Sequence, residues 1–142
     1  MKKSKYDIDD DTPTYIVRRR LADARKEKRI YLIVNIVRVL NGRGCLNVHL
    51  SDSEKKELLE KLRLIRSGRK VLAKWLPLGY QTVRFLGLAR QFSGRKVRLT
   101  KRDIRRIKRA AKFYRDNGDW HSRRQLRSLV LCAKELNLVI EI

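Results

Sequence analysis

The stretch LTKRDIRRIKRAAKFYRDNG, residues 99–118, is the part of the sequence that most clearly indicates a fold. Thr100 is a typical N-cap residue, and Asp103 stands at the capping-box position three residues later. Apolar residues then recur every three or four positions until Asn117-Gly118, a pair typical of a helix end. The stretch therefore predicts an amphipathic helix between Thr100 and Gly118. Its apolar stripe consists of Ile104, Ile107, Ala111 and Tyr114, widened by Ala110 and Phe113.

Every other face of this predicted helix is basic, and the surrounding sequence continues the charge. The 142 residues hold 37 Lys and Arg against 15 Asp and Glu, a formal net charge of +22. Residues 61–134 alone carry 23 basic and 3 acidic side chains. So concentrated a charge attracts polyanions, most strongly at low salt. Nucleic acid is the favoured partner, and an acidic protein or a membrane surface is a secondary option. The alternative without a partner is a charged surface that only keeps the protein soluble.

Similar signals along the chain predict an all-α, or mainly α, fold of five to six helices. A long apolar-periodic segment runs from Thr12-Pro13 to Asn41, with a break near Arg29. Residues 1–12 are expected to form a flexible charged arm, and residues 13–142 a single compact domain. Further helices are predicted over residues 51–66, 69–76, 80–92 and 122–136, and a short C-terminal strand over 138–142, with a possible partner strand at 46–50.

Two larger patterns concern the same helix. Residues 80–115 have the outline of a helix-turn-helix, although the turn at 93–99 is longer than the standard three or four residues. Residues 48–54 and 97–103 also resemble each other at an offset of 49, and each leads into a capped helix. A duplicated helix pair explains this similarity, and so does ordinary capping chemistry at two unrelated helices.

Composition and motifs argue against an enzyme and against a cofactor or metal. Histidine occurs only at 49 and 121 and cysteine only at 45 and 132, without a spacing that suits a metal or a nucleophilic site. The glycines form no phosphate-binding or dinucleotide fingerprint. The apolar run Ile30–Val34 is far shorter than the ~18 residues that a membrane helix needs, and no secretory signal is expected.

The candidate nucleic-acid-binding residues are therefore the basic side chains of helix 100–115 and of its two flanking segments. Phosphate contact is the expected role for most of them, with base or shape recognition left to one or two arginines. These residues are Arg95, Lys96, Arg98, Lys101, Arg102, Arg105, Arg106, Lys108, Arg109, Lys112, Arg123, Arg124 and Arg127. Substitution of Arg105, Arg106 and Arg109 is expected to weaken binding without unfolding the chain, because all three are predicted to be exposed.

Two tryptophans allow a second kind of contact. Trp120 stands among arginines and Trp75 precedes Pro77, so either ring could stack on an unpaired base. The expectation from composition is that both pack beneath turns. The Gly-Arg-Lys turns at 68–70 and 94–96 suit either close contact with a phosphate or a plain helix end.

These observations favour a non-enzymatic nucleic-acid-binding protein of the transcription or replication regulator type. DNA is favoured over RNA because the candidate recognition element is a helix. The alternative is a structural or adaptor subunit of a ribonucleoprotein or other assembly, in which the apolar helix 30–40 docks a protein partner or a second copy. The expected location is the cytoplasm or nucleoid, or the nucleus of a eukaryote, without membrane association.

Overall fold

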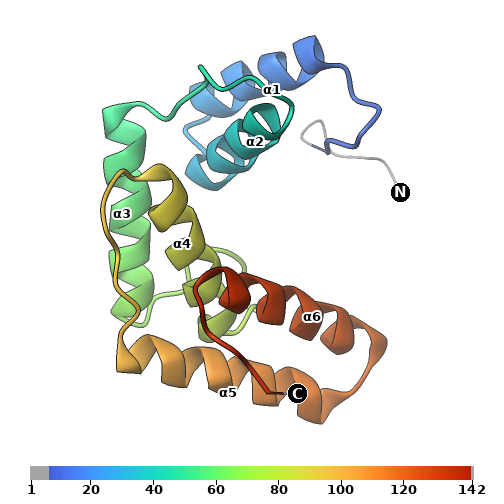
Figure 1. Cartoon of the computed structure of the whole chain (residues 1–142), viewed down its shortest axis with the longest axis vertical. Coiled ribbons are helices and arrows are strands. Elements are labelled where there is room, and N and C mark those ends of the chain that lie inside the picture. The colour runs from blue at the N-terminus through green and yellow to red at the C-terminus, as the bar shows by residue number, and fades with distance from the viewer. Residues whose placement is uncertain (1–6, 142) are drawn as a thin grey trace. The chain divides into compact units, whose positions relative to one another are not determined.

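The computed structural model describes residues 7–141, and these residues form six α-helices (Figure 1). The predicted all-α fold is confirmed. Residues 138–141 are not in a strand, so the predicted C-terminal strand is wrong over the part of it that the structure describes. The helices are α1 (Thr14–Lys26), α2 (Ile30–Gly42), α3 (Asp52–Arg66), α4 (Leu78–Phe92), α5 (Lys101–Asn117) and α6 (Trp120–Glu135).

The chain divides into two compact units between Glu57 and Leu58, within α3. The N-terminal unit (residues up to 57) carries 14 basic and 9 acidic side chains, and the C-terminal unit (58 onward) carries 23 and 6. The net charges are therefore +5 and +17. The single domain predicted over residues 13–142 stays a prediction.

In the N-terminal unit, α1 packs against α2. The predicted break near Arg29 is present, because the chain leaves the helix at residues 27–29 and Lys28 takes a φ of 54°. Helix α1 begins at Thr14, with Pro13 as its N-cap residue. Residues 1–6 of the predicted arm lie outside the described residues, and the guanidinium of Arg43 donates to the carbonyl groups of Asp9 and Thr12.

In the C-terminal unit, α4 packs against α5 and α6, and α5 packs against α6. Ile65 of α3, Phe85 of α4, Ile107 of α5 and Leu129 of α6 are each almost completely buried and belong to the core. The crossing of α4 and α5 depends on Gly79. A Cβ atom there would lie 2.0 Å from the Arg106 carbonyl oxygen, so the two backbones can approach this closely only without a side chain.

Residues 69–76 do not form the predicted short helix; they form an irregular loop that the buried side chain of Gln81 stabilises. Its Oε1 accepts hydrogen bonds from the backbone N–H groups of Val71 and Leu72, both at 2.9 Å. Its Nε2 donates to the carbonyl groups of Ala73 and Leu76, both at 3.1 Å. These four bonds satisfy backbone groups that a helix would have paired internally.

The duplicated helix pair is not supported, because α4 packs against α5 whereas α2 packs against α1. The similarity between residues 48–54 and 97–103 is confined to the caps. Ser51 and Glu54 form a capping box at the start of α3, as Thr100 and Asp103 do at the start of α5. Helix α6 begins at Trp120 with Asp119 as its N-cap, two residues before the predicted start at Ser122.

Candidate nucleic-acid interface

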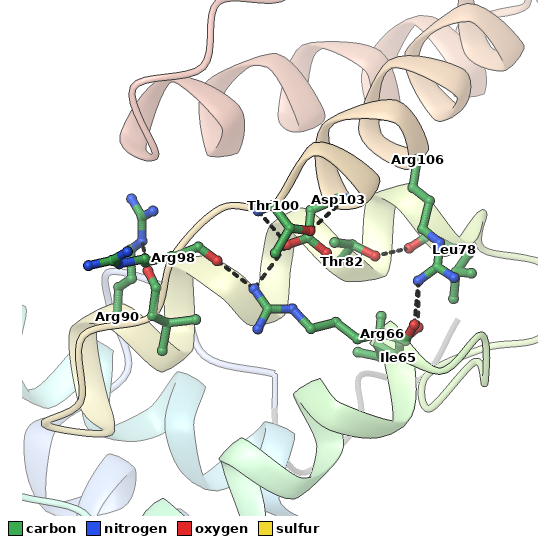
Figure 2. A network of polar contacts seen from close by, with 10 residues as sticks. Ile65, Arg66, Leu78, Thr82, Arg90, Arg98, Thr100, Asp103 and Arg106 are labelled. Carbon is green, nitrogen blue, oxygen red and sulfur yellow. Dashed lines mark hydrogen bonds and ion pairs between the residues drawn. The ribbon is translucent and has the colours of Figure 1, made fainter.

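The start of α5 is held by a polar network that reaches the end of α3 (Figure 2). The Thr100 side chain accepts from the Asp103 N–H at 3.1 Å, and Asp103 Oδ2 accepts from the Thr100 N–H at 3.0 Å. Arg66 of α3 donates to the same Oδ2 at 2.9 Å and to the Arg98 carbonyl oxygen at 2.6 Å. Arg90 of α4 donates to the Val97 carbonyl oxygen at 2.9 Å, so the connection before α5 is bonded to both preceding helices.

The predicted basic residues of the C-terminal unit lie along α5 and in the segments that precede and follow it. Asp103, Ile107, Ala110, Ala111 and Tyr114 face the core, which turns the opposite face of the helix outward. Twelve of the thirteen predicted residues are exposed: Arg95, Lys96, Arg98, Lys101, Arg102, Arg105, Lys108, Arg109, Lys112, Arg123, Arg124 and Arg127. Arg123, Arg124 and Arg127 lie on α6, which packs against α5. The structure therefore brings these three residues and the basic residues of α5 into one unit.

Arg106 is the exception, and its predicted exposure is wrong. Its Nη1 donates to the carbonyl groups of Ile65 and Arg66, at 3.1 and 2.9 Å, and the residue is half-buried. Burial, followed by the positive charge of Arg102, lowers the pKa of Arg106 from its ordinary value, although Asp103 opposes the shift. Arg106 therefore caps the C-terminal carbonyl groups of α3 and ties α5 to that helix.

The two flanks of α5 border different hollows. One flank, with Lys108, Lys112 and Arg115, faces the C-terminal segment 139–141 across a cavity of about 360 Å³. The other faces the loop before α4 and the first turn of α4 across a cavity of about 460 Å³. This second cavity has three cationic side chains, Lys70, Arg106 and Arg109, and two aromatic ones, Trp75 and Phe113. We refer to it as the aromatic pocket.

The exposure of the aromatic residues differs from the sequence-based expectation. Trp75 and Trp120 are each 66% exposed rather than packed beneath turns, and Phe113 is 51% exposed rather than part of the core. The Trp75 ring lies against His121, with centroids 5.8 Å apart, and the Arg124 guanidinium lies 5.4 Å from the centre of the Trp120 ring. Three exposed aromatic rings thus accompany the basic side chains of the C-terminal unit.

The aromatic pocket is the part of the site that the sequence did not predict. The only signals were Trp75 before Pro77 and Lys70 in a Gly-Arg-Lys turn, and nothing in the spacing connected either residue with Phe113. The sequence predicts Phe113 as part of the widened apolar stripe of the helix. In the structure Phe113 instead lies on the same flank of α5 as Arg109, four residues earlier, and Arg106, seven residues earlier.

Over residues 7–141, no helix combines the length and the apolar character needed to cross a membrane. In the same part of the chain, no cluster of three or more His, Cys, Asp or Glu side chains could hold a metal ion. No protein-family model, no curated protein and no solved structure matches the chain.

Proposed function

We propose that this protein binds nucleic acid without catalysing a reaction, through the exposed basic side chains of α5 and its flanking segments. One observation carries the proposal. Twelve of the thirteen predicted cationic residues are exposed on a unit whose net charge is +17. Neutralising phosphates would release counterions from the nucleic acid and relieve the repulsion among these side chains.

Duplex DNA is the target that the arrangement of helices favours. Helix α4, the connection at residues 93–100 and α5 have the order of a helix-turn-helix, and α5 offers a basic outer face about 25 Å long. Most of the basic side chains on this face would contact phosphates, because phosphate and sugar oxygens take about half to two-thirds of the hydrogen bonds in protein–DNA interfaces. A regulator of transcription or replication, in the cytoplasm, nucleoid or nucleus, would use such a surface.

The decisive experiment is a salt titration of binding to matched duplex DNA, duplex RNA and single strands between 50 and 300 mM salt. The wild-type chain should show a steep salt dependence and retain duplex DNA at the highest salt. The triple variant Arg105→Ala, Lys108→Ala and Lys112→Ala removes three exposed charges without touching Arg106. Its slope of log K against log salt should be smaller by about 3, roughly one for each lost phosphate contact.

A matched variant separates the role of α5 from that of net charge. Arg18→Ala, Arg19→Ala and Lys26→Ala also remove three exposed charges, but from α1. This variant should keep the wild-type slope. Equal losses in the two triple variants would show that total charge sets binding, and equally weak binding to all polyanions would overturn the DNA proposal.

A structural or adaptor role in a ribonucleoprotein or other assembly is the second candidate. Val139 favours it, because this exposed apolar side chain lines the same cavity as Lys108 and Lys112 and could contact a protein partner there. Helix α2 (predicted as the docking helix 30–40) has six buried apolar residues, with Tyr31, Leu32 and Val39 half-buried. Size-exclusion chromatography with light scattering, at several protein concentrations, would detect the homodimer that this helix was predicted to form.

A further inference from the structure

The aromatic pocket has the composition of a site for a planar, negatively charged ligand. Trp75 and Phe113 supply exposed ring surface, while Lys70, Arg106 and Arg109 supply positive charge around the same cavity. Its volume of about 460 Å³ lies within the ~300–1,000 Å³ that is usual for ligand pockets. A purely apolar partner would cover the three cations without offering them a negative charge, and a simple anion would leave the rings unused.

The Trp75 wall of the pocket is positioned before any ligand arrives. Gln81 holds the surrounding loop through four hydrogen bonds to the backbone of Val71, Leu72, Ala73 and Leu76. His121 at the start of α6 packs against the indole ring at 5.8 Å. An aromatic surface held in this way loses little conformational entropy when another ring stacks on it.

Two of the three cations around the rings are positioned as well. Nη1 of Arg106 is engaged with the carbonyl groups of Ile65 and Arg66, which leaves its charge fixed at the cavity wall. The Lys70 ammonium donates to the Lys74 carbonyl oxygen at 3.0 Å, and two of its three donors remain for other acceptors. Arg109 is exposed and lies one turn before Phe113 on α5.

We infer that the aromatic pocket binds an unpaired nucleotide, with the base stacked on Trp75 or Phe113 and the phosphate paired with Arg109 and Lys70. The inference rests on the proposed function and deepens it, because the pocket borders the basic face of α5. Stacking on aromatic side chains tolerates any base, since every base has a π face. The pocket would thus recognise an unpaired position in a strand by its flexibility rather than by its sequence.

The first test compares three labelled duplexes of one sequence: fully paired, with one bulged nucleotide, and with an abasic bulge. The wild-type chain should bind the bulged duplex more tightly than the other two. Trp75→Ala and Phe113→Ala should each remove this preference, lowering affinity for the bulged duplex by about 5- to 150-fold. Trp75→Phe keeps a ring and should restore part of the preference.

Trp120→Ala is the matched control, because Trp120 is as exposed as Trp75 and also lies beside an arginine, but does not line the pocket. It should keep the preference for the bulge. Affinity for the fully paired duplex should be unchanged in all four variants, since the basic face of α5 is intact. An equal effect of Trp120→Ala and Trp75→Ala on bulge preference would overturn the inference. So would the finding that the wild-type chain neither prefers the bulged duplex nor binds a nucleotide.

A second test does not depend on nucleic-acid binding by α5. The chain has 2 tryptophans, so Trp120→Phe leaves Trp75 as its only indole fluorophore. Titration with a nucleoside monophosphate should quench this fluorescence to saturation, and adding Phe113→Ala should weaken the effect. Saturable quenching without a bulge preference would show that the pocket binds a free nucleotide rather than an unpaired nucleotide within a strand.

Two further outcomes separate the proposals. If the wild-type chain does not bind the paired duplex but a nucleotide still quenches its fluorescence, the proposed function is overturned and the nucleotide assignment of the pocket is not. An acidic peptide containing tyrosine that displaced the nucleotide at lower concentration would overturn the nucleotide assignment in favour of a protein ligand.

Discussion

Arg66 of α3 donates a 2.9 Å hydrogen bond to Oδ2 of Asp103, a carboxylate that is only 1% exposed at the start of α5. The same oxygen accepts the Thr100 N–H, which completes the capping box. A buried carboxylate in the most basic part of the chain is therefore structural. It determines where α5 begins and joins that helix to α3, and with it the position of the proposed interface.

Asp103→Ala should lower the free energy of unfolding of the C-terminal unit by about 2–4 kcal/mol. The substitution removes the capping box and leaves Arg66 without its carboxylate partner, although partial exposure of Arg66 limits the cost. Urea denaturation followed by far-ultraviolet circular dichroism measures the change. Glu60→Ala breaks an exposed pair with Arg63 on α3 and should change little. Equal losses in the two variants would show that the buried pair contributes nothing special.

Two glycines of α4 should respond in opposite directions to alanine. Gly79→Ala places a Cβ atom against the backbone of Arg106 and should destabilise the chain by about 1–3 kcal/mol or more. At Gly87 no atom lies within 4 Å of the added carbon, so Gly87→Ala should stabilise the chain by roughly 0.5–1 kcal/mol. Thermal melting of both variants checks the pair, and a neutral Gly79→Ala would mean that α4 and α5 can separate without cost.

Gln81→Leu should loosen the loop that presents Trp75. The N–H groups of Val71 and Leu72 would lose their acceptor. We expect their hydrogen exchange to become faster than in the wild-type chain, by more than any change in α5. Unsatisfied backbone groups should lower the free energy of unfolding by about 1–3 kcal/mol. Gln91→Leu, on the exposed end of the same helix, is the control and should leave the exchange rates of the loop unchanged.

Tyr114 should make the chain sensitive to alkaline pH. Burial, with a smaller effect of Tyr80, raises the pKa of Tyr114 from 10.0 to about 12. Because the folded state keeps the phenol protonated while the unfolded state ionises, the free energy of unfolding should fall as pH rises from 10.0 to about 12. Tyr114→Phe should reduce this fall, as measured by urea denaturation at pH 9 and pH 11.

The Tyr114→Phe variant should also be at least as stable as the wild type at pH 7. The Tyr114 hydroxyl is buried and has no hydrogen-bond partner among the described residues, so its removal relieves an unsatisfied group. Tyr80→Phe is the contrasting variant, because the Tyr80 hydroxyl lies 3.2 Å from the Ser128 hydroxyl. It should cost about 0.5–1.5 kcal/mol, and a larger loss for Tyr114→Phe would indicate a hidden partner.

The helical fold could be predicted because its signals are local. Thr100, Asp103 and Gly118 mark the ends of α5 through interactions within a few residues, and the structure contains both caps. The break near Arg29 was likewise visible in the sequence. Arg106, in contrast, stands three residues after Asp103 and four before Ala110, at the edge of the buried face, and only the structure shows that it donates to the carbonyl groups at the end of α3.

By itself, the sequence determined five of its six predicted helices apart from their exact ends, the break before α2 and the basic surface of α5, because periodicity, capping and net charge are properties of neighbouring residues. Only the tertiary structure decided that residues 69–76 form a loop and that Trp75, Phe113 and Arg109 border one cavity. The reason is physical. The bonds of Gln81 satisfy backbone groups five to ten residues away, and the contact between Gly79 and Arg106 brings α4 against α5.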